Sequence, residues 1–262
     1  GIEEMVVATT TGKTALEAPY CGMHTHWQGL EQLCRSMYWS RRHLRDQFGL
    51  DLPLYYIVDN PSVAWPAAQA WALAGGRYVV DCRQGWRTGG KDAFRHTGVP
   101  RVFWWVGPDE RHKVLFTYTT HYAIWKDVVQ AEYEKMLTLV LAKLRAVENG
   151  AYGPYPYDLL LAPSYRDHDP PHKNESDHVV EWNKRWRYPE LRIDDPARFM
   201  AEMERRYGDR IPTLRGDMNN YSADYSAANS DLFGRKRAAA LRLATAEGLA
   251  SVARLVDPAY PL

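Results

Sequence analysis

Hydrophobic residues recur at helical spacing in several stretches of the chain. Across residues 29–48 they fall three or four positions apart, which predicts an amphipathic helix. Gly49 follows directly, and a glycine in this place typically ends a helix in the left-handed conformation. Comparable patterns predict helices over residues 2–7, 65–74, 129–147, 176–186 and 234–255, and Asp195-Pro196 begins one more.

Other apolar runs are short and continuous, which favours strands over helices. Residues 52–58 are almost entirely apolar, as expected for a strand buried on both faces of a parallel sheet. Further strands are predicted at residues 14–20, 77–81, 102–106, 113–118, 157–161 and 212–215. Gly107-Pro-Asp-Glu110 separates two of these runs and predicts a β-hairpin.

The order of these elements indicates the fold class. Strand, helix, glycine and strand follow one another between residues 52 and 81, which is the pattern of a βαβ unit. We therefore predict an α/β fold: an incomplete or distorted (β/α) barrel with mostly parallel strands. Residues 1–216 would form the barrel-like domain. Residues 217–262, dominated by one helix, would begin a helical-bundle region.

The composition restricts the classes of partner. The chain has 262 residues, of which 45% are hydrophobic and 25% charged, as is typical of a globular protein. A formal net charge of +1 provides no field to attract nucleic acid, and no stretch is apolar enough to span a bilayer. We therefore expect neither a nucleic-acid nor a membrane partner. No signal-peptide pattern follows Gly1, and the sequence indicates neither compartment nor oligomeric state.

The cysteines predict no cross-linked framework. Cys21, Cys34 and Cys82 are odd in number and form no Cys-x-x-Cys pair. We therefore expect neither a set of disulfides nor a zinc site built from thiolates.

Ionisable residues follow several of the predicted strands. Ligand sites of α/β sheets gather at the carboxyl ends of their strands. The segments in such positions contain His24, His26, Asp59, Asp81, Asp167, His168, Asp169 and Asp217. Because these ends would meet at one edge of the sheet, we predict a functional site there.

Asp59 is the first candidate for chemistry. It follows the apolar run at residues 54–58, so its carboxylate would be held rigidly where a buried strand opens into a loop. Such a carboxylate suits a nucleophile or a metal ligand. Asp-Asn-Pro-Ser is also ordinary turn chemistry, and the local residues leave both interpretations open.

The other polar segments are compatible with sugar recognition. His24 and His26 alternate on a segment that we predict to be extended, so both would point to one side. They could share a metal or belong to a hydrogen-bonded loop. Asp167-His168-Asp169 and Asp217 could bind sugar hydroxyls or lie in solvated turns. The residues alone do not decide between these alternatives.

The chain is rich in aromatic residues, with 10 tryptophans and 17 tyrosines. Flat rings can stack on sugar rings or fill the core. Trp65 and Trp105 are the candidates for contact with a sugar, since the alternation of strand side chains lets only one of Trp104 and Trp105 face a given site. Gly-rich phosphate loops, Gly-x-Ser-x-Gly and His-Glu-x-x-His are absent from the sequence, which argues against kinases, α/β-hydrolases and zincins.

The order of motifs resembles the N-terminal catalytic domain of glycoside hydrolase family 38, the α-mannosidase family. The resemblance begins with a helix, Phe48-Gly-Leu-Asp-Leu-Pro53, a strand, Asp59, Trp65-Pro-Ala-Ala-Gln69 and Ala74-Gly-Gly-Arg-Tyr78. It continues in Phe103-Trp-Trp-Val-Gly-Pro-Asp109, Tyr157-Asp-Leu-Leu-Leu161 and Gly216-Asp217. Each motif is short, but the order holds over most of the chain, as in a divergent relative.

The resemblance implies a retaining α-mannosidase-like hydrolase acting on a carbohydrate substrate. Asp59 matches the family's nucleophile, which is also a zinc ligand, so zinc is the expected cofactor. A retaining mechanism needs a second carboxyl group about 5 Å away as acid/base. Asp81, Asp109, Asp167 and Asp169 are the candidates, of which we select Asp169. The expected substrate contacts are His24, His26, Trp65, Trp105, Asp167, His168 and Asp217.

The chain also departs from the family. It contains no His-x-Asp, the motif that supplies zinc ligands near the start of the family's domain, and a further ligand histidine lies in the family's helical region. We expect truncation at both ends, or loss of the metal, so that this chain has its nucleophile without a complete metal shell. Two alternative functions remain: a non-catalytic carbohydrate-binding relative and a polysaccharide deacetylase-like metal enzyme.

Overall fold

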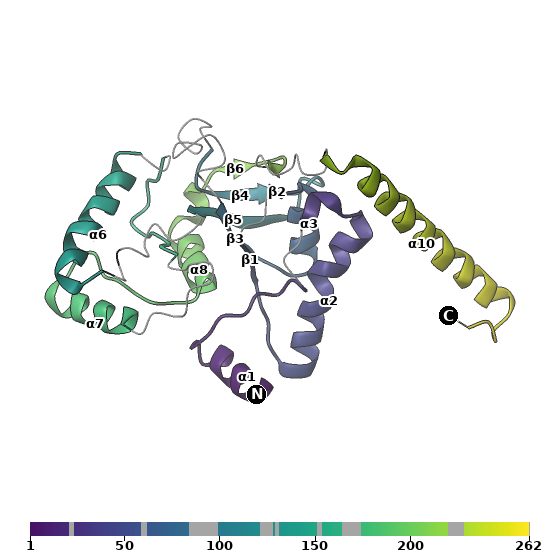
Figure 1. The fold of residues 1–262 in the computed structure, drawn as a ribbon, viewed down its shortest axis with the longest axis horizontal. Coiled ribbons are helices and arrows are strands. Elements are labelled where there is room, and N and C mark those ends of the chain that lie inside the picture. The colour runs from purple at the N-terminus through teal and green to yellow at the C-terminus, as the bar shows by residue number, and fades with distance from the viewer. Residues whose placement is uncertain are drawn as a thin grey trace.

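The computed structural model describes residues 1–20, 24–58, 62–83, 99–120, 128, 131–150, 154–163, 174–219 and 228–261. At its centre lies a five-stranded sheet with the strand order β1-β3-β5-β4-β6 (Figure 1). The strands are β1 (Leu54–Val58), β3 (Tyr78–Arg83), β4 (Val102–Val106), β5 (Lys113–Thr120) and β6 (Thr213–Leu214). β1, β3 and β5 run parallel, β4 is antiparallel to β5, and β6 is parallel to β4. The predicted fold class is confirmed: a mixed α/β fold with a mostly parallel sheet, consistent with a partial barrel.

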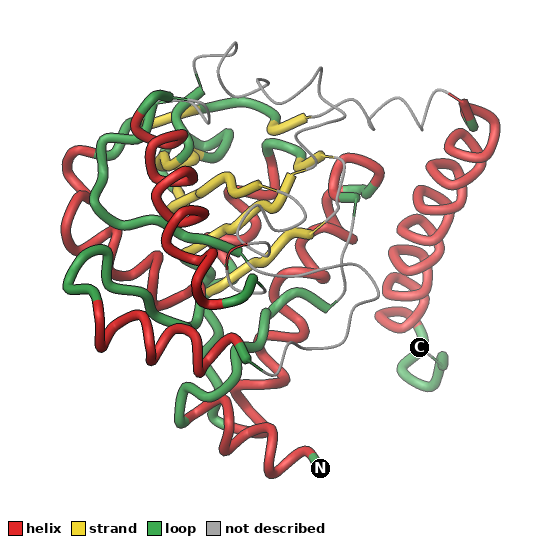
Figure 2. Tube along the Cα trace, turned by 60° about the vertical axis from the view of Figure 1, so that its left-hand side comes forward, coloured by secondary structure: helices red, strands yellow, loops and turns green. Residues whose placement is uncertain are grey.

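Helices lie on both sides of these strands (Figure 2). The described helices are α1 (Ile2–Thr10), η1 (Thr25–Trp27), α2 (Leu30–Phe48), α3 (Pro66–Leu73), α6 (Tyr133–Glu148), α7 (Glu175–Arg185), α8 (Pro196–Tyr207), η2 (Gly208–Arg210) and α10 (Ser230–Val256). α10 extends away from the rest of the molecule in Figure 1, and none of its side chains is buried. Among the described helices, none combines the length and apolar character that a membrane span requires.

Two hydrophobic clusters pack on opposite faces of the sheet because side chains alternate along each strand. On β5, Phe116 belongs to the cluster that contains residues of α2 and α3. Its neighbour Leu115 belongs to the cluster that contains residues of α8. A third cluster joins α6 and α7 around the buried Trp182.

Local sequence signals explain several helix ends. Gly49 ends α2 with a φ of 67°, in the left-handed conformation predicted for it. The side chain of Asp195 accepts a hydrogen bond of 2.7 Å from the Ala197 N–H and so caps α8. The helix predicted over residues 176–186 begins one residue earlier, since α7 starts at Glu175 and Asn174 precedes it.

Two predicted strands do not form. Residues 14–20 lie close to β1, where the Ala18 N–H donates to Leu54 O at 3.2 Å, but they build no ladder. Residues 154–163 also join no sheet. Their alternating side chains Tyr155, Tyr157, Leu159 and Leu161 pack against the cluster beneath α8. The apolar pattern of residues 157–161 therefore reflects burial of one side of the segment. It does not reflect pairing with another strand.

Arg41 of α2 fixes the far end of α3 against the sheet. Its guanidinium donates to Leu52 O at 3.0 Å and to Ala74 O at 2.6 Å, and it pairs with Asp51. Ala74 is the C-terminal cap of α3, so a cation there satisfies a carbonyl that has no partner within the helix. Gly75 has a φ of 86°, and a Cβ at this position would lie 2.1 Å from Arg41 Nη1.

Replacing Arg41 by methionine is expected to lower the free energy of unfolding by about 2–4 kcal/mol, because two shielded carbonyl groups lose their donors. The measurement is urea denaturation, with a shifted midpoint and an unchanged m-value. Arg42→Met is the matched control, since Arg42 is exposed and its contact with Asp46 is 3.5 Å. We expect the control to change the free energy of unfolding by no more than about 0.5 kcal/mol. Equal losses in the two variants would contradict this role of Arg41.

Candidate functional site

Two candidate histidines surround one indole in the short helix η1. The ring of Trp27 lies 4.0 Å from that of His24 and 5.1 Å from that of His26, measured between centroids. The two imidazoles are 6.2 Å apart and perpendicular. The extended backbone predicted for this segment was wrong, because Thr25–Trp27 form a 3-10 turn. The histidines are therefore brought together by packing on Trp27 and not by strand alternation.

The segment that follows Asp59 links η1 to Asp217. The Ala64 N–H donates to the buried Thr25 hydroxyl at 2.7 Å, and the Trp65 N–H donates to Asp217 Oδ1 at 2.6 Å. Just before these two residues, β2 (Ser62–Val63) pairs antiparallel with β7 (Met218–Asn219). Three parts of the sequence therefore meet at residues 62–65, a few positions after Asp59 along the chain.

The two candidate tryptophans have different environments. Trp65 is half-buried, and its indole N–H donates to Val106 O at 2.7 Å. Trp105 has no exposed surface, and its ring packs edge-on against Phe116. The Trp105 indole N–H donates to Gly216 O at 2.9 Å, so this side chain supports the turn that presents the exposed Asp217. In this arrangement Trp105 can position Asp217 but has no face open to a sugar.

Two of the carboxylates considered for acid/base chemistry, those of Asp81 and Asp109, lie in different environments. Asp81 is fully buried on β3, in register with Ile57 of β1 and Tyr118 of β5. Asp109 lies in the β4–β5 turn, where its Oδ2 is 2.5 Å from His112 Nδ1. That hydrogen bond, together with those from backbone N–H groups, lowers the pKa of Asp109 to about 2. A general acid needs a raised pKa, so the lowered pKa of Asp109 does not fit that role.

The remaining candidates lie outside the described residues: Asp59, Asp167, His168 and Asp169. Within the part of the chain that is described, no three side chains of His, Cys, Asp or Glu gather closely enough to hold a metal ion. A metal shell of three or more such ligands would therefore include residues outside the described ranges.

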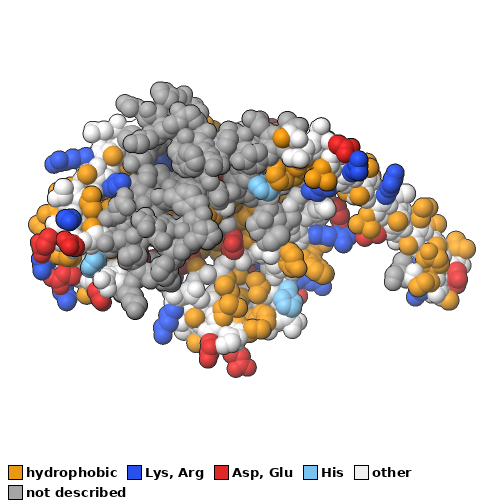
Figure 3. All heavy atoms as spheres, viewed as in Figure 1, with side chains coloured by type: hydrophobic (Ala, Val, Ile, Leu, Met, Phe, Trp, Pro, Cys, Tyr) orange, Lys and Arg blue, Asp and Glu red, His pale blue; other side chains and the backbone are white. Residues whose placement is uncertain are grey.

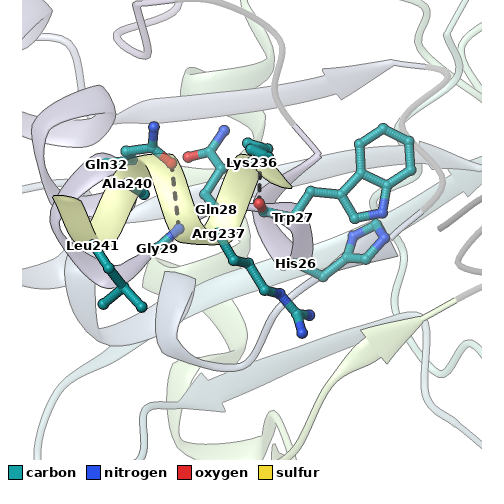
Figure 4. Close-up of a pocket in the computed structure, with 9 residues that line it drawn as sticks. All are labelled: His26, Trp27, Gln28, Gly29, Gln32, Lys236, Arg237, Ala240 and Leu241. Carbon is teal, nitrogen blue, oxygen red and sulfur yellow. Dashed lines mark hydrogen bonds between the residues drawn. The ribbon is translucent and has the colours of Figure 1, made fainter. Parts of the chain in front are cut away.

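A pocket of about 330 Å³ lies between the start of α2 and the first half of α10 (Figure 4). Its polar lining side chains are His26, Gln28, Gln32, Lys236 and Arg237. Lys236 Nζ donates to Trp27 O at 2.8 Å, and Phe233 packs on the Trp27 ring, so α10 is attached to η1 (Figure 4). Basic side chains are visible along the start of α10 in Figure 3. Of these lining residues, only His26 was a candidate from the sequence; the run Arg235-Lys236-Arg237 was the available signal for the cations.

Substitution of Asp217 tests the link to Trp65. Asp217→Ala removes the acceptor of the Trp65 N–H and should lower the free energy of unfolding by about 1 kcal/mol. Asp217→Asn keeps an acceptor oxygen, so its effect should be smaller. Urea denaturation measures both variants, and amide exchange at Trp65 should accelerate only in the alanine variant. Equal exchange rates in the two variants would contradict the hydrogen bond.

The Asp109–His112 pair predicts an acid-sensitive contribution to stability. The pKa of Asp109 falls from 3.8 to about 2 on folding, so its ionised form stabilises the folded chain above its ordinary pKa. The stabilisation is lost as the pH falls from about 4 to about 2. The difference in urea midpoint between the parent and Asp109→Asn should therefore shrink over this range. A difference that stays constant between these pH values would contradict the assignment.

Comparison with known proteins places the chain in a family. A family model described as "Glycosyl hydrolases family 38 N-terminal domain" matches residues 14–224. Among solved structures, the chain is similar to an alpha-mannosidase from Enterococcus faecalis V583, with a TM-score of 0.65 and 18% identity, over 83% of this chain and 23% of that one. No curated protein sequence matches the chain. Because the family match covers most of its residues and the fold agrees, the chain belongs to glycosyl hydrolase family 38, within that family's N-terminal domain.

Proposed function

We propose that this chain is part of a retaining glycosidase of the α-mannosidase type, with Asp59 as its nucleophile. The observation that carries the proposal is the family match across residues 14–224, which includes Asp59. The hydrogen bonds from Ala64 and Trp65 support it, because they gather η1 and Asp217 around the segment that follows this carboxylate. The chain spans less than a quarter of the solved alpha-mannosidase, so the activity of the whole protein is part of the proposal.

The proposed reaction has two steps, as in other retaining glycosidases. In the first, the Asp59 carboxylate attacks the anomeric carbon while Asp169 gives its proton to the leaving oxygen. The glycosidic bond breaks and a glycosyl ester of Asp59 forms. In the second, the Asp169 carboxylate takes a proton from water, the water oxygen attacks the anomeric carbon, and Asp59 is released. Two inversions leave the α configuration unchanged.

The substrate contacts are proposed on the same segments. His24 and His26 can form hydrogen bonds with sugar hydroxyls, as can Asp167 and His168. Asp217 Oδ1 is taken by the Trp65 N–H, and its second oxygen can accept from a hydroxyl. Trp65 offers a half-buried ring beside it. Trp105 acts indirectly in this scheme, through Gly216.

Zinc is proposed as the cofactor, with Asp59 as the one ligand assigned in this chain. A bound zinc ion would act as a Lewis acid that polarises a substrate oxygen. The described residues do not themselves supply a donor set, since no three candidate ligands converge among them. The steps above therefore rest on the two carboxyl groups alone.

The proposed domain boundary lies near residue 216. Residues 1–216 would form a partial catalytic domain around the sheet, and residues 217–262 would begin a helical-bundle region. α10 supports this division, because none of its side chains is buried whereas α2 and α3 contribute to the core of the sheet.

The decisive experiment measures hydrolysis of a chromogenic α-mannoside, with and without zinc, by this chain and by a version extended with flanking gene sequence. We expect zinc-dependent turnover in the extended form and its loss in Asp59→Asn. Asp46→Asn is the control, because Asp46 lies on the exposed surface of α2 and pairs only with neighbouring arginines in the described part of the chain.

Other outcomes would favour the alternative functions. Sugar binding without turnover in either form, unaffected by Asp59→Asn, would replace the hydrolase proposal with a carbohydrate-binding role. Release of acetate from an acetylated polysaccharide, without cleavage of the mannoside, would replace it with deacetylase chemistry.

A further inference from the structure

The pocket between α2 and α10 is lined by positively charged side chains. Two cationic side chains, Lys236 and Arg237, line it, and none of its described lining residues is acidic. The chain as a whole is nearly neutral, with a formal net charge of +1, so this concentration of positive charge is local. A pocket of this kind favours a ligand with a negatively charged group.

Arg237 differs from the two residues before it along the chain in having no partner among the described residues. Arg235 pairs with Asp231 at 2.9 Å, and Lys236 donates to Trp27 O at 2.8 Å. Within the described residues, the guanidinium of Arg237 makes no ion pair or hydrogen bond. It extends past η1 on the same side as His26 in Figure 4. Its five N–H donors in a planar fork suit a carboxylate or a phosphate.

Side-chain amides line the same pocket. Gln28 and Gln32 are both among its lining residues. A carboxamide has N–H donors and an acceptor oxygen, so it can bind a hydroxyl. A ligand that carries hydroxyls next to an anionic group therefore matches the pocket better than a bare anion.

The pocket adjoins the proposed sugar site. Thr25, in the same 3-10 turn as His26 and Trp27, is hydrogen-bonded to Ala64 in the segment that follows Asp59. A saccharide held by His24 and His26 would therefore have the pocket within reach on the α10 side of η1.

We propose that the substrate of this site is an acidic saccharide, whose phosphate or carboxylate group binds Arg237 and Lys236 in this pocket. The inference rests on the proposed glycosidase function and narrows its substrate class. Hydroxyls of the same saccharide would bind the carboxamides of Gln28 and Gln32. Because the charged contacts are exposed, their contribution should weaken as the salt concentration rises.

Binding of three sugars to the 262-residue chain tests the proposal by isothermal titration calorimetry. The probes are mannose, mannose 6-phosphate and mannuronic acid, which are neutral, phosphorylated and carboxylated. We expect at least one acidic sugar to bind at least about tenfold more tightly than mannose at low salt, since charge-assisted contacts are the stronger ones. The acid that gains this preference identifies the anionic group. Equal affinities for all three sugars would overturn the proposal.

Two arginine variants of α10 test whether the preference for an acidic sugar arises in the pocket. Arg237→Ala should remove most of the preference for the acidic sugar and leave mannose binding unchanged. Arg242→Ala removes the same charge from an exposed position of the same helix that does not line the pocket, and it should keep the preference. Equal losses in both variants would overturn the pocket assignment. Both positions are exposed, so circular dichroism should confirm an intact fold in each variant.

Inorganic phosphate separates a saccharide site from a general anion site. If phosphate alone binds as tightly as mannose 6-phosphate, the hydroxyl contacts are absent and the proposal fails. The measurement reports affinity and not turnover, so a chain that hydrolyses nothing can still bind the acidic sugar. Conversely, turnover of a neutral mannoside with no acidic preference would overturn this inference and leave the proposed hydrolase intact.

Discussion

Two consecutive backbone N–H groups just before α3 hold the candidate site together. Ala64 donates to Thr25, 39 positions away, and Trp65 donates to Asp217, 152 positions away. Trp65 is the N-terminal cap of α3, where an N–H group has no partner within the helix and must bind elsewhere. The turn after β6 provides its acceptor, and η1 provides the acceptor for Ala64. The chain entering one short helix thus brings together segments that are remote in sequence.

The opposite end of α3 is held in a comparable way. Arg41 donates to Ala74 O at its C-terminus and to Leu52 O just before β1. α3 is therefore fixed at both ends. Trp105 adds support from beneath, since it is buried in the sheet and binds Gly216 next to Asp217. Rigid positioning of this kind is what a site needs when its polar groups lie on loops.

The surroundings of the proposed site combine two kinds of recognition. Histidine, tryptophan and aspartate side chains near Trp65 suit hydroxyl groups, and they lie on elements joined directly to one another. The pocket on the α10 side adds two cations and two side-chain amides. Both regions share η1, so the proposed saccharide would contact them together. This arrangement is compatible with membership of glycosyl hydrolase family 38.

The sequence determined much of the framework of this protein by itself. Helical spacing and Gly49 located α2 with its left-handed end, the apolar run located β1, and Gly107-Pro-Asp-Glu110 located the hairpin. These features depend on neighbouring residues, so local patterns are sufficient to predict them. The order of short motifs also indicated the family that the comparison confirmed. The sequence pattern wrongly predicted a strand at residues 157–161. Its alternating apolar side chains are partly buried against the core, and such burial does not require a strand partner.

Only the tertiary structure decided which distant residues meet. Local sequence contains no sign that Trp65 binds Asp217, that Trp105 is enclosed beneath Gly216, or that Arg237 shares a pocket with His26. Each contact joins segments whose separation along the chain is large, and the sheet and its helices set their distance in space. The sequence thus determined the elements and the residue types available for chemistry, whereas packing determined their combination, because contact between remote segments depends on the whole fold and not on neighbouring residues.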